Sequence, residues 1–445
     1  MSLDTALTHA QAWLDGLNAR PVHATADLAT LRRRLNKSLP ENGLPPEQVI
    51  ADLVRDAEGG ILGCAGGRFF GWVIGGALPS ALAADWLTSA WDQNAALYAC
   101  APAAAVVEEV AGAWLKELLG LPRTASFALV SGCQMAHVTC LAAARHALLE
   151  RHGWDVERSG LAGAPPIRIL TSDAHGSIAR AVRLLGMGTD HISRFEPGDL
   201  ERALASDAAA PTVVVLQAGD INTGAYDDFA ALIPLAHRHG AWVHVDGAIG
   251  LWAAASSRFR HLLNGVAEAD SWATDGHKWL NVPYDCGYAF VADAAAHRAC
   301  MSHRAEYLTH AIEARDQIDW NPEWSRRARG FPTYAAIREL GQNGLAALVE
   351  RCSDHARTLV SRIGELPGVQ ILARPIINQG LVRFYDDDHR TEEVIDAIVA
   401  TGEAFFGATT WRGQRAMRVS VCNWRTSNED VERAVRAVEG VLRAG

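Results

Sequence analysis

A lysine at position 278 is the residue of this sequence best suited to covalent chemistry. It lies in the segment Asp270–Leu280, where a short apolar run and a glycine precede the triplet His277, Lys278 and Trp279. The amine of a lysine forms a Schiff base with a carbonyl compound when it is accessible, rigidly held and lowered in pKa. The same triplet also occurs around ordinary surface lysines, so the assignment depends on what else the sequence brings nearby.

An aspartate at position 246 ends a second apolar run, Trp242–Asp246. Open α/β sheets bind ligands at the carboxyl ends of their strands. A carboxylate buried there is costly unless it pairs with a cation or a hydrogen-bond donor. The protonated nitrogen of a pyridine ring is a suitable partner, because the carboxylate then keeps the ring able to accept electrons. A helix N-cap or a turn aspartate is the alternative.

Two further segments join a β-rich run to a helical one. Val130–Ala136 passes through a small-residue turn that contains Cys133 and Gln134, and backbone N–H groups at the start of a helix bind phosphate. Ser172–Ser177 contains His175, whose ring could stack on an aromatic cofactor. For His175 the alternative is a helix cap or a core histidine.

A polar loop, Ala218–Ala225, follows another apolar run. Asn222 and Thr223 can hydrogen-bond a ligand hydroxyl, and a structural turn explains them almost as well. Each of the five segments comes directly after a predicted strand. Their order along the chain is a phosphate turn, a stacking histidine, a polar loop, an aspartate and a lysine, and together they indicate one ligand site.

The elements that must position these residues alternate between strand and helix from Ser126 onward. Such alternation is typical of a mainly parallel sheet covered by helices on both faces. A long helical stretch over residues 332–363 then leads to a smaller α/β part. We predict an N-terminal helical segment (1–80), a large domain (81–340) and a small C-terminal domain (341–445). The predicted strands are 126–130, 167–171, 212–217, 241–245, 271–274, 287–291, 369–373, 381–385 and 417–421, and the predicted helices between and after them include 134–151, 175–185, 228–239, 391–400 and 427–442.

In this order the five segments resemble those of the group II pyridoxal-phosphate decarboxylases, which include the aromatic amino-acid, glutamate and histidine enzymes. Arg260–Val266 with Ala269–Ser271 resembles the stretch before the lysine in the aromatic enzymes. Arg68–Phe70 and Ala101–Pro102 resemble that family's N-terminal substrate-pocket segments. The resemblance covers nearly the whole chain. It implies a fold-type I α/β enzyme, homodimeric, that holds pyridoxal 5'-phosphate as a Schiff base and converts an L-amino acid to its amine and carbon dioxide.

The resemblance also implies a role for each candidate residue. Lys278 carries the cofactor, Asp246 pairs with the pyridinium nitrogen, and His175 stacks on the ring. Asn222 lies near the ring substituents. The residues that contact the phosphate are Cys133, Gln134 and His277.

The string Tyr307–His310 resembles a Tyr-Leu-x-His string on a mobile loop of the aromatic decarboxylases. A phenol there can protonate the carbanion left when carbon dioxide departs, and an exposed loop aromatic is the alternative. A carbon–carbon lyase or an aminotransferase would share the five segments. Arg418 is the only obvious candidate for the carboxylate-binding arginine of an aminotransferase, and we prefer a structural role for it.

The sequence departs from the family pattern at several positions. Gln134 stands where small hydroxyl residues are frequent, and Asp275 stands where asparagine is frequent. These changes bear on the substrate rather than on cofactor binding. Aromatic residues near the expected pocket favour a large or aromatic substrate side chain, and they are Phe69, Phe70, Trp72 and Tyr98.

The composition limits the partners of the protein. A formal net charge of −10 argues against nucleic acid or anionic lipid as the main partner. No apolar run is long enough to span a bilayer, and the N-terminus lacks the apolar core of a signal peptide. We therefore expect a cytoplasmic protein with reduced thiols. The eight cysteines show no zinc-site spacing, so we expect no metal.

Overall fold

The computed structural model describes residues 2–196, 198–303 and 314–444. The chain divides into two compact units, one of residues 77–353 and one of residues 1–76 together with 354–445. The N-terminal helices therefore belong to the same compact unit as the C-terminal residues. The three-part division at residues 80 and 340 stays a prediction.

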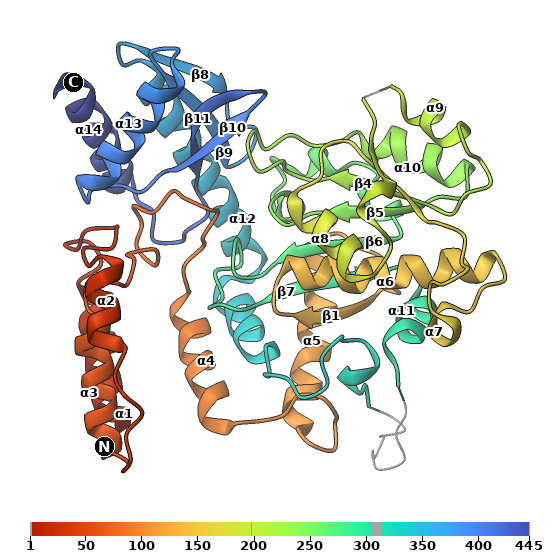
Figure 1. Cartoon of the computed structure of the whole chain (residues 1–445), viewed down its shortest axis with the longest axis horizontal. Helices are drawn as coiled ribbons and strands as arrows, with labels where there is room; N and C mark the ends of the chain where they lie inside the picture. The colour runs from red at the N-terminus through yellow and green to blue at the C-terminus, as the bar shows by residue number, and fades with distance from the viewer. Residues whose placement is uncertain (1, 197, 304–313, 445) are drawn as a thin grey trace. The chain divides into compact units, whose positions relative to one another are not determined.

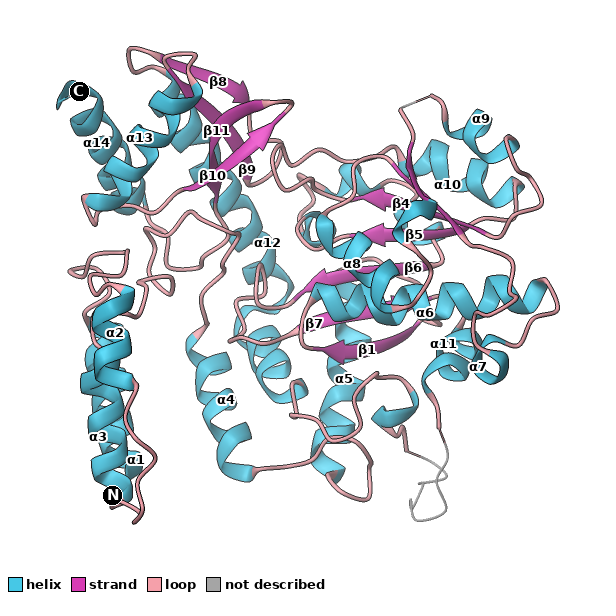
Figure 2. Cartoon of the chain, in the orientation of Figure 1, coloured by secondary structure: helices cyan, strands magenta, loops and turns pink. Residues whose placement is uncertain are grey.

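The larger unit is built on a seven-stranded sheet of order β1-β7-β6-β5-β4-β2-β3 within the described residues (Figure 2). Strands β3, β2, β4, β5 and β6 run parallel, and β7 is antiparallel to both β6 and β1. The mainly parallel sheet that the alternation predicts is thus confirmed. The strands are β1 (Ser126–Val130), β2 (Arg168–Thr171), β3 (Ile192–Arg194), β4 (Thr212–Gln217), β5 (Trp242–Asp246), β6 (Ser271–Asp275) and β7 (Gly287–Val291).

Helices cover this sheet because its central strands are buried along their whole length and consist largely of apolar and β-branched residues. Helix α6 packs against β5, β6 and β7 and carries a run of small buried residues that permits a close approach (Figure 1). The α-helices of this unit are α4 (Pro79–Trp91), α5 (Pro102–Leu118), α6 (Cys133–Arg151), α7 (Val156–Ser159), α8 (Gly176–Leu184), α9 (Leu200–Ala205), α10 (Phe229–Arg238) and α11 (Ala294–Met301). Its 3₁₀ helices are η1 (Thr189–His191), η2 (Gly250–Ala255), η3 (Arg260–Leu263), η4 (Val266–Glu268) and η5 (Gln317–Asp319).

Helix α12 (Gly330–Gly364) belongs to both units. Its helical geometry breaks at Gly341, where φ is 60° and ψ is −176°. A residue with a Cβ rarely adopts this backbone conformation, so the glycine allows the long helix to kink.

The smaller unit contains a four-stranded antiparallel sheet of order β10-β11-β9-β8 in the part of the chain that the structure describes. Helix α13 packs on β9 and β11 and against α14. The strands of this unit are β8 (Val369–Ala373), β9 (Gln379–Phe384), β10 (Gly407–Trp411) and β11 (Gln414–Ser420). Its C-terminal helices are α13 (Asp388–Ala400) and α14 (Asn428–Ala444), and its N-terminal helices are α1 (Ser2–Asp15), α2 (Leu28–Leu35) and α3 (Pro46–Ala57).

A buried arginine explains why the N-terminal residues belong to this unit. The guanidinium of Arg68 donates to the backbone carbonyls of Gly402 and Glu403 and to those of three residues after α1. Next to it, the ring of Phe69 stacks on Phe405 with centroids 4.4 Å apart. Charge-assisted hydrogen bonds of this kind join segments that are far apart in the sequence.

Candidate active site

Two aspartates end adjacent parallel strands of the large sheet. Asp246 is the last residue of β5 and Asp275 is the last residue of β6, and Asp246 pairs in register with Ala273. Their side chains therefore point to the same face of the sheet, the face that α6 covers. Asp246 is 1% exposed and Asp275 is 3% exposed, so each carboxylate depends on the protein for its partners.

The amine of Lys278 lies 2.8 Å from Oδ2 of Asp275. Oδ1 of the same carboxylate accepts the backbone N–H of Cys133 at 2.6 Å. Burial disfavours the charged amine, but the Asp275 carboxylate outweighs burial and raises the pKa of Lys278 above its ordinary value. The sequence predicts a lysine of lowered pKa, whereas the neighbouring Asp275 carboxylate stabilises the protonated amine and raises its pKa.

His277 is oriented by its neighbours. Its Nδ1 accepts the backbone N–H of Cys286 at 3.3 Å, which leaves the proton on Nε2, and Nε2 lies 3.5 Å from Oδ1 of Asp275. The ring stacks on Tyr284 at 4.3 Å between centroids. Burial lowers the pKa of His277, so the imidazole is a neutral donor that points at the Asp275 carboxylate.

The start of α6 faces this cluster. A Cβ on Gly132 would lie 3.2 Å from Cε1 of His277, and a Cβ on Gly287 would lie 2.4 Å from the carbonyl carbon of Gly132. Gly287 is therefore required by the close approach of its backbone to that of Gly132, and a side chain on Gly132 would press on the His277 ring. Cys133 is buried, and burial raises the pKa of its thiol well above the ordinary value. Gln134 donates to the carbonyl of Ser177 at 3.3 Å.

His175 and Asn222 lie on loops after β2 and β4. His175 caps α8 by accepting the backbone N–H of Ser177, and its Nδ1 lies 2.8 Å from the hydroxyl of that residue. The backbone N–H of Asn222 donates to Asp220 in a tight turn. That loop begins at Ala218, whose N–H donates to the carbonyl of Asp246. The two loops therefore leave the same sheet edge as the aspartates.

The Asp246 carboxylate interacts with an imidazole and a backbone N–H rather than directly with a lysine. Its Oδ2 lies 3.5 Å from Nε2 of His137 on α6, and its Oδ1 accepts the backbone N–H of Ala248 at 3.1 Å. Burial disfavours ionisation, but His137, the Ala248 amide and the more distant Lys278 together lower the pKa of Asp246. Asp246 is therefore a buried carboxylate that stays ionised at neutral pH.

His137 is not among the site residues that the sequence predicts. It lies four residues after Cys133 on the buried face of α6, where an imidazole is hard to distinguish from core packing. Cys133, His137 and Asp246 each offer one atom to a group that lies within 4.8 Å, which is compact enough for a metal ion. The spacing of cysteines and histidines in the sequence does not predict this group of three residues, because Asp246 is more than 100 positions away from the other two.

Tyr307 lies outside the described residues. The structure brings Cys133, His277 and Lys278 together around Asp275, places Asp246 beside Cys133, and connects Gln134 to the His175 loop.

The donors at this edge fit pyridoxal 5'-phosphate. The N–H groups at the α6 terminus, His277 and Lys278 suit a phosphate or an aldehyde, and the ionised Asp246 suits a protonated ring nitrogen. Gly132 keeps the space between α6 and His277 clear of a side chain. One feature opposes the fit. The Asp275 carboxylate already accepts the backbone N–H of Cys133, which a phosphate at the start of α6 would also need.

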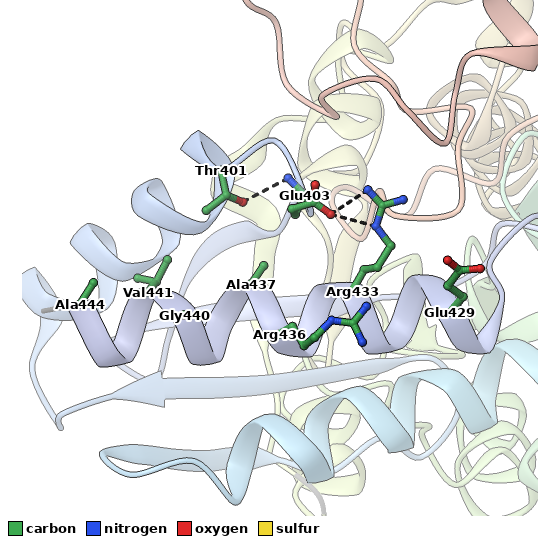
Figure 3. Close-up of a pocket in the computed structure, with 9 residues that line it drawn as sticks. All are labelled: Thr401, Glu403, Glu429, Arg433, Arg436, Ala437, Gly440, Val441 and Ala444. Atoms are coloured by element: carbon green, nitrogen blue, oxygen red, sulfur yellow. Dashed lines mark hydrogen bonds and ion pairs between the residues drawn. The ribbon is translucent and has the colours of Figure 1, made fainter.

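A separate hollow of about 780 Å³ lies in the smaller unit along α14 (Figure 3). Arg433 and Glu403 form an ion pair of 2.8 Å at this hollow. None of the candidate residues lines it, so the size of a hollow does not locate the chemistry.

Comparison with known proteins agrees with this geometry. A family model described as the pyridoxal-dependent decarboxylase conserved domain matches residues 29–385. The aromatic-L-amino-acid decarboxylase of Bacillus atrophaeus is 25% identical over 94% of this chain and 90% of its own length. The acidic amino acid decarboxylase GADL1 of Mus musculus is 29% identical over 69% of this chain and 58% of its own length.

A solved structure of Oryza sativa TDC with PLP and tryptamine superimposes with a TM-score of 0.92. It covers 100% of this chain and 97% of that chain at 23% identity. At this identity the likeness establishes the fold, and the predicted fold-type I architecture is confirmed.

Proposed function

Because the chain belongs to the pyridoxal-dependent decarboxylase family, we propose that Lys278 binds the cofactor covalently and that Asp246 pairs with its ring nitrogen. The protein is a pyridoxal-phosphate-dependent amino-acid decarboxylase. The observation that supports the residue assignment is the convergence of one lysine and two buried aspartates on a single sheet edge. The carbon–carbon lyase and aminotransferase readings have no support in the comparisons.

Pyridoxal phosphate, when bound, supplies the electron sink that accepts the electron pair of the bond to the leaving carboxylate. The ionised Asp246 keeps a proton on the ring nitrogen, which strengthens that sink. Because Asp246 is buried, water does not screen this interaction.

Lys278 must lose a proton before its amine can bond to a carbonyl carbon. Oδ2 of Asp275 lies 2.8 Å from the amine and stabilises its protonated form, so loss of the proton must overcome this ion pair. We assign the phosphate to the α6 terminus, where the resemblance puts Cys133 and Gln134, and to the Nε2–H of His277. His175 is assigned to stacking on the ring and Asn222 to the ring substituents.

The proton that replaces carbon dioxide is assigned to the phenol of Tyr307 on the evidence of the Tyr-Leu-x-His string. A phenol is a suitable acid for a carbanion-like centre.

We propose an L-amino acid with a large or aromatic side chain as the substrate. The Bacillus relative is named for aromatic amino acids and the rice structure for tryptamine, whereas the mouse relative is named for acidic amino acids. Tyr98, which belongs to the same unit as the candidate site, has an exposed ring.

We propose a homodimer in which the N-terminal helices lie at the interface. The described parts of α1 and α2 bury no residue, and α3 buries only Asp56. These helices pack on one another but leave large apolar side chains exposed, and such exposed apolar surface supports association with a second copy. Large exposed apolar side chains on these helices are Leu3, Leu7, Leu28, Leu35, Val49 and Leu53.

No helix within the described ranges is long and apolar enough to cross a membrane. We propose a cytoplasmic location, which the lack of disulfides among the described cysteines supports.

A panel of L-amino acids, followed for release of both amine and carbon dioxide, tests the activity and its substrate. We expect stoichiometric amine and carbon dioxide from aromatic substrates, with Lys278→Ala as the inactive control. Carbonyl product with no carbon dioxide would contradict decarboxylation. Release from acidic substrates alone would contradict only the substrate class.

A further inference from the structure

A chain of buried hydrogen bonds runs from Asp246 into the core beneath the sheet edge. Nδ1 of His137 lies 2.9 Å from Nε2 of His244, and the two rings are nearly perpendicular at 85°. Nδ1 of His244 lies 2.9 Å from the hydroxyl of Ser271. The indole N–H of Trp242 donates to the same hydroxyl at 2.9 Å. Helix α6 and strands β5 and β6 supply these residues (Figure 2).

The side chains of this hydrogen-bond series are shielded from water. Each of their donors must therefore find its acceptor within the series. His137, His244 and Ser271 are 0% exposed, and Trp242 is 1% exposed. An indole N–H can only donate, so it occupies one lone pair of the Ser271 oxygen. The hydroxyl proton of Ser271 is then available to Nδ1 of His244.

The remaining protons follow from this first one. A neutral His244 that accepts at Nδ1 carries its proton on Nε2 and donates it to Nδ1 of His137. A neutral His137 that accepts at Nδ1 carries its proton on Nε2, 3.5 Å from Oδ2 of Asp246. Every donor in the chain thus has an acceptor, and the last N–H points toward the carboxylate.

Burial lowers the pKa of His244 to about 3. His244 is therefore neutral throughout the physiological range, as the proton arrangement requires. The other titratable groups around this hydrogen-bond network are Cys133 and Cys140 on α6, the latter beside Ser271, and, beyond Asp246, Asp275 and Lys278.

We propose that His137 is a positioning residue that holds Asp246 ionised and aimed at the ring nitrogen of the cofactor. His244 and Ser271 fix the tautomer of His137 so that Nε2 donates. The inference rests on the proposed pairing of Asp246 with that nitrogen. It gives a functional role to a histidine that contacts neither substrate nor cofactor.

The thiol of Cys133 competes for the same imidazole nitrogen, since Sγ lies 3.4 Å from Nε2 of His137. A thiol is a weak hydrogen-bond acceptor, whereas a buried carboxylate is a strong one. The proton on Nε2 is therefore better satisfied by Asp246. The same three groups could instead bind a metal ion, and the experiment below separates the two roles.

The test uses cofactor labelled with ¹⁵N in the ring, bound to the full-length enzyme. The ¹⁵N chemical shift reports directly whether the ring nitrogen carries a proton, independently of turnover. His137→Phe keeps a ring but removes the donor, and His137→Gln restores an N–H near the position of Nε2. His297→Phe is the matched control, because His297 is also buried and bonded at both nitrogens, to Ser126 and Trp320.

In His137→Phe we expect the ring nitrogen to lose its proton at a lower pH than in the wild type. We expect kcat to fall by about 10- to 100-fold, the scale known for residues that orient a reacting ligand, with KM changed much less. His137→Gln should recover much of both properties, and His297→Phe should match the wild type. Ser271→Ala should lower kcat by roughly fivefold, the effect of one neutral hydrogen bond.

An unchanged ¹⁵N titration in folded His137→Phe and His137→Gln, with native near-ultraviolet dichroism, would overturn the proposal. A stoichiometric metal in the purified apoenzyme that is lost with His137 would overturn it in favour of a metal ligand. If the wild-type ring nitrogen carries no proton at any pH, the pairing with Asp246 fails instead, and the two failures are thereby distinguished.

Discussion

Asp246 and Asp275 are two buried carboxylates at the ends of neighbouring strands, yet the protein treats them differently. Asp275 has a cation 2.8 Å away and a backbone N–H at 2.6 Å. Asp246 has an imidazole at 3.5 Å and a backbone N–H at 3.1 Å. The first charge is balanced by the chain itself, whereas the second has looser partners. The difference agrees with the proposal that Asp246 pairs with the ring nitrogen of the cofactor, while Asp275 pairs with Lys278 within the chain.

Removal of the lysine should have the largest effect on this pair. Lys278→Ala removes the covalent attachment point, and we expect kcat to fall by roughly four to six orders of magnitude. It also leaves Asp275 without its cation, which should destabilise the fold by about 3 kcal/mol. Steady-state turnover and denaturant unfolding measure the two effects. Activity within tenfold of the wild type would remove Lys278 from the mechanism.

Substitution of the other carboxylate should come next. Asp246→Asn removes the charge that keeps the ring nitrogen protonated, and we expect kcat to fall by about a thousandfold, as for loss of a main electrostatic group. The phosphate contacts should still hold the cofactor, so equilibrium dialysis should show retained binding. Turnover close to normal would make the two aspartates equivalent structural residues.

Neither aspartate is assigned as the donor of the proton that replaces carbon dioxide. Tyr307→Phe should therefore bind substrate normally but release amine about a hundredfold more slowly, with a larger share of carbonyl product. Product analysis by chromatography measures that share. Wild-type rate and product ratio would exclude the tyrosine and reopen the question of which residue supplies the proton.

Asp275→Asn should affect cofactor loading more than turnover. The Asp275 carboxylate raises the pKa of Lys278, so its removal should let the amine lose its proton at lower pH. We expect the pH profile of apoenzyme reconstitution to move to lower pH, followed by the visible absorbance of the bound cofactor. A profile that stays in place would show that Asp275 does not control the lysine.

The smallest effect should be on stability in acid. Both aspartates have folded pKa values below the ordinary 3.8. Their contribution to the free energy of unfolding is therefore present above about pH 3.8 and is lost as the pH falls toward the folded values. Asp246→Asn should flatten this loss relative to the wild type in urea titrations between pH 5 and pH 2. Curves that remain parallel would show that Asp246 is not ionised in the folded chain.

Several parts of the molecule could be predicted from local pattern. Asp246 and Lys278 follow apolar runs whose ends must meet at one sheet edge, so their convergence is implied by strand order alone. His137 is hidden by the helical periodicity of α6. In the sequence, Asp275 stands out only as a departure from the family pattern. Its partner Lys278 is three residues away, but nothing in the local sequence shows that the pair is buried.

Longer-range features have no local signature. Strand β10, whose sequence is Gly-Ala-Thr-Thr-Trp, lies at the sheet edge and lacks an apolar run. Strand β3 has only three residues. The association of Arg68 with Gly402 joins positions 334 residues apart, and no periodicity within either segment predicts it.

The assignment of the cofactor to Lys278 can be tested most directly by chemical trapping, because the sequence contains only three lysines, Lys37, Lys116 and Lys278. Lys37 pairs with Asp56, and Lys116 donates to the carbonyls of Arg123 and Ala125. Holoenzyme reduced with borohydride, digested and mapped by mass spectrometry should carry one cofactor per chain on the peptide that contains Lys278. Cofactor on the peptide of Lys37 or Lys116, or no covalent label in a fully loaded enzyme, would contradict the account.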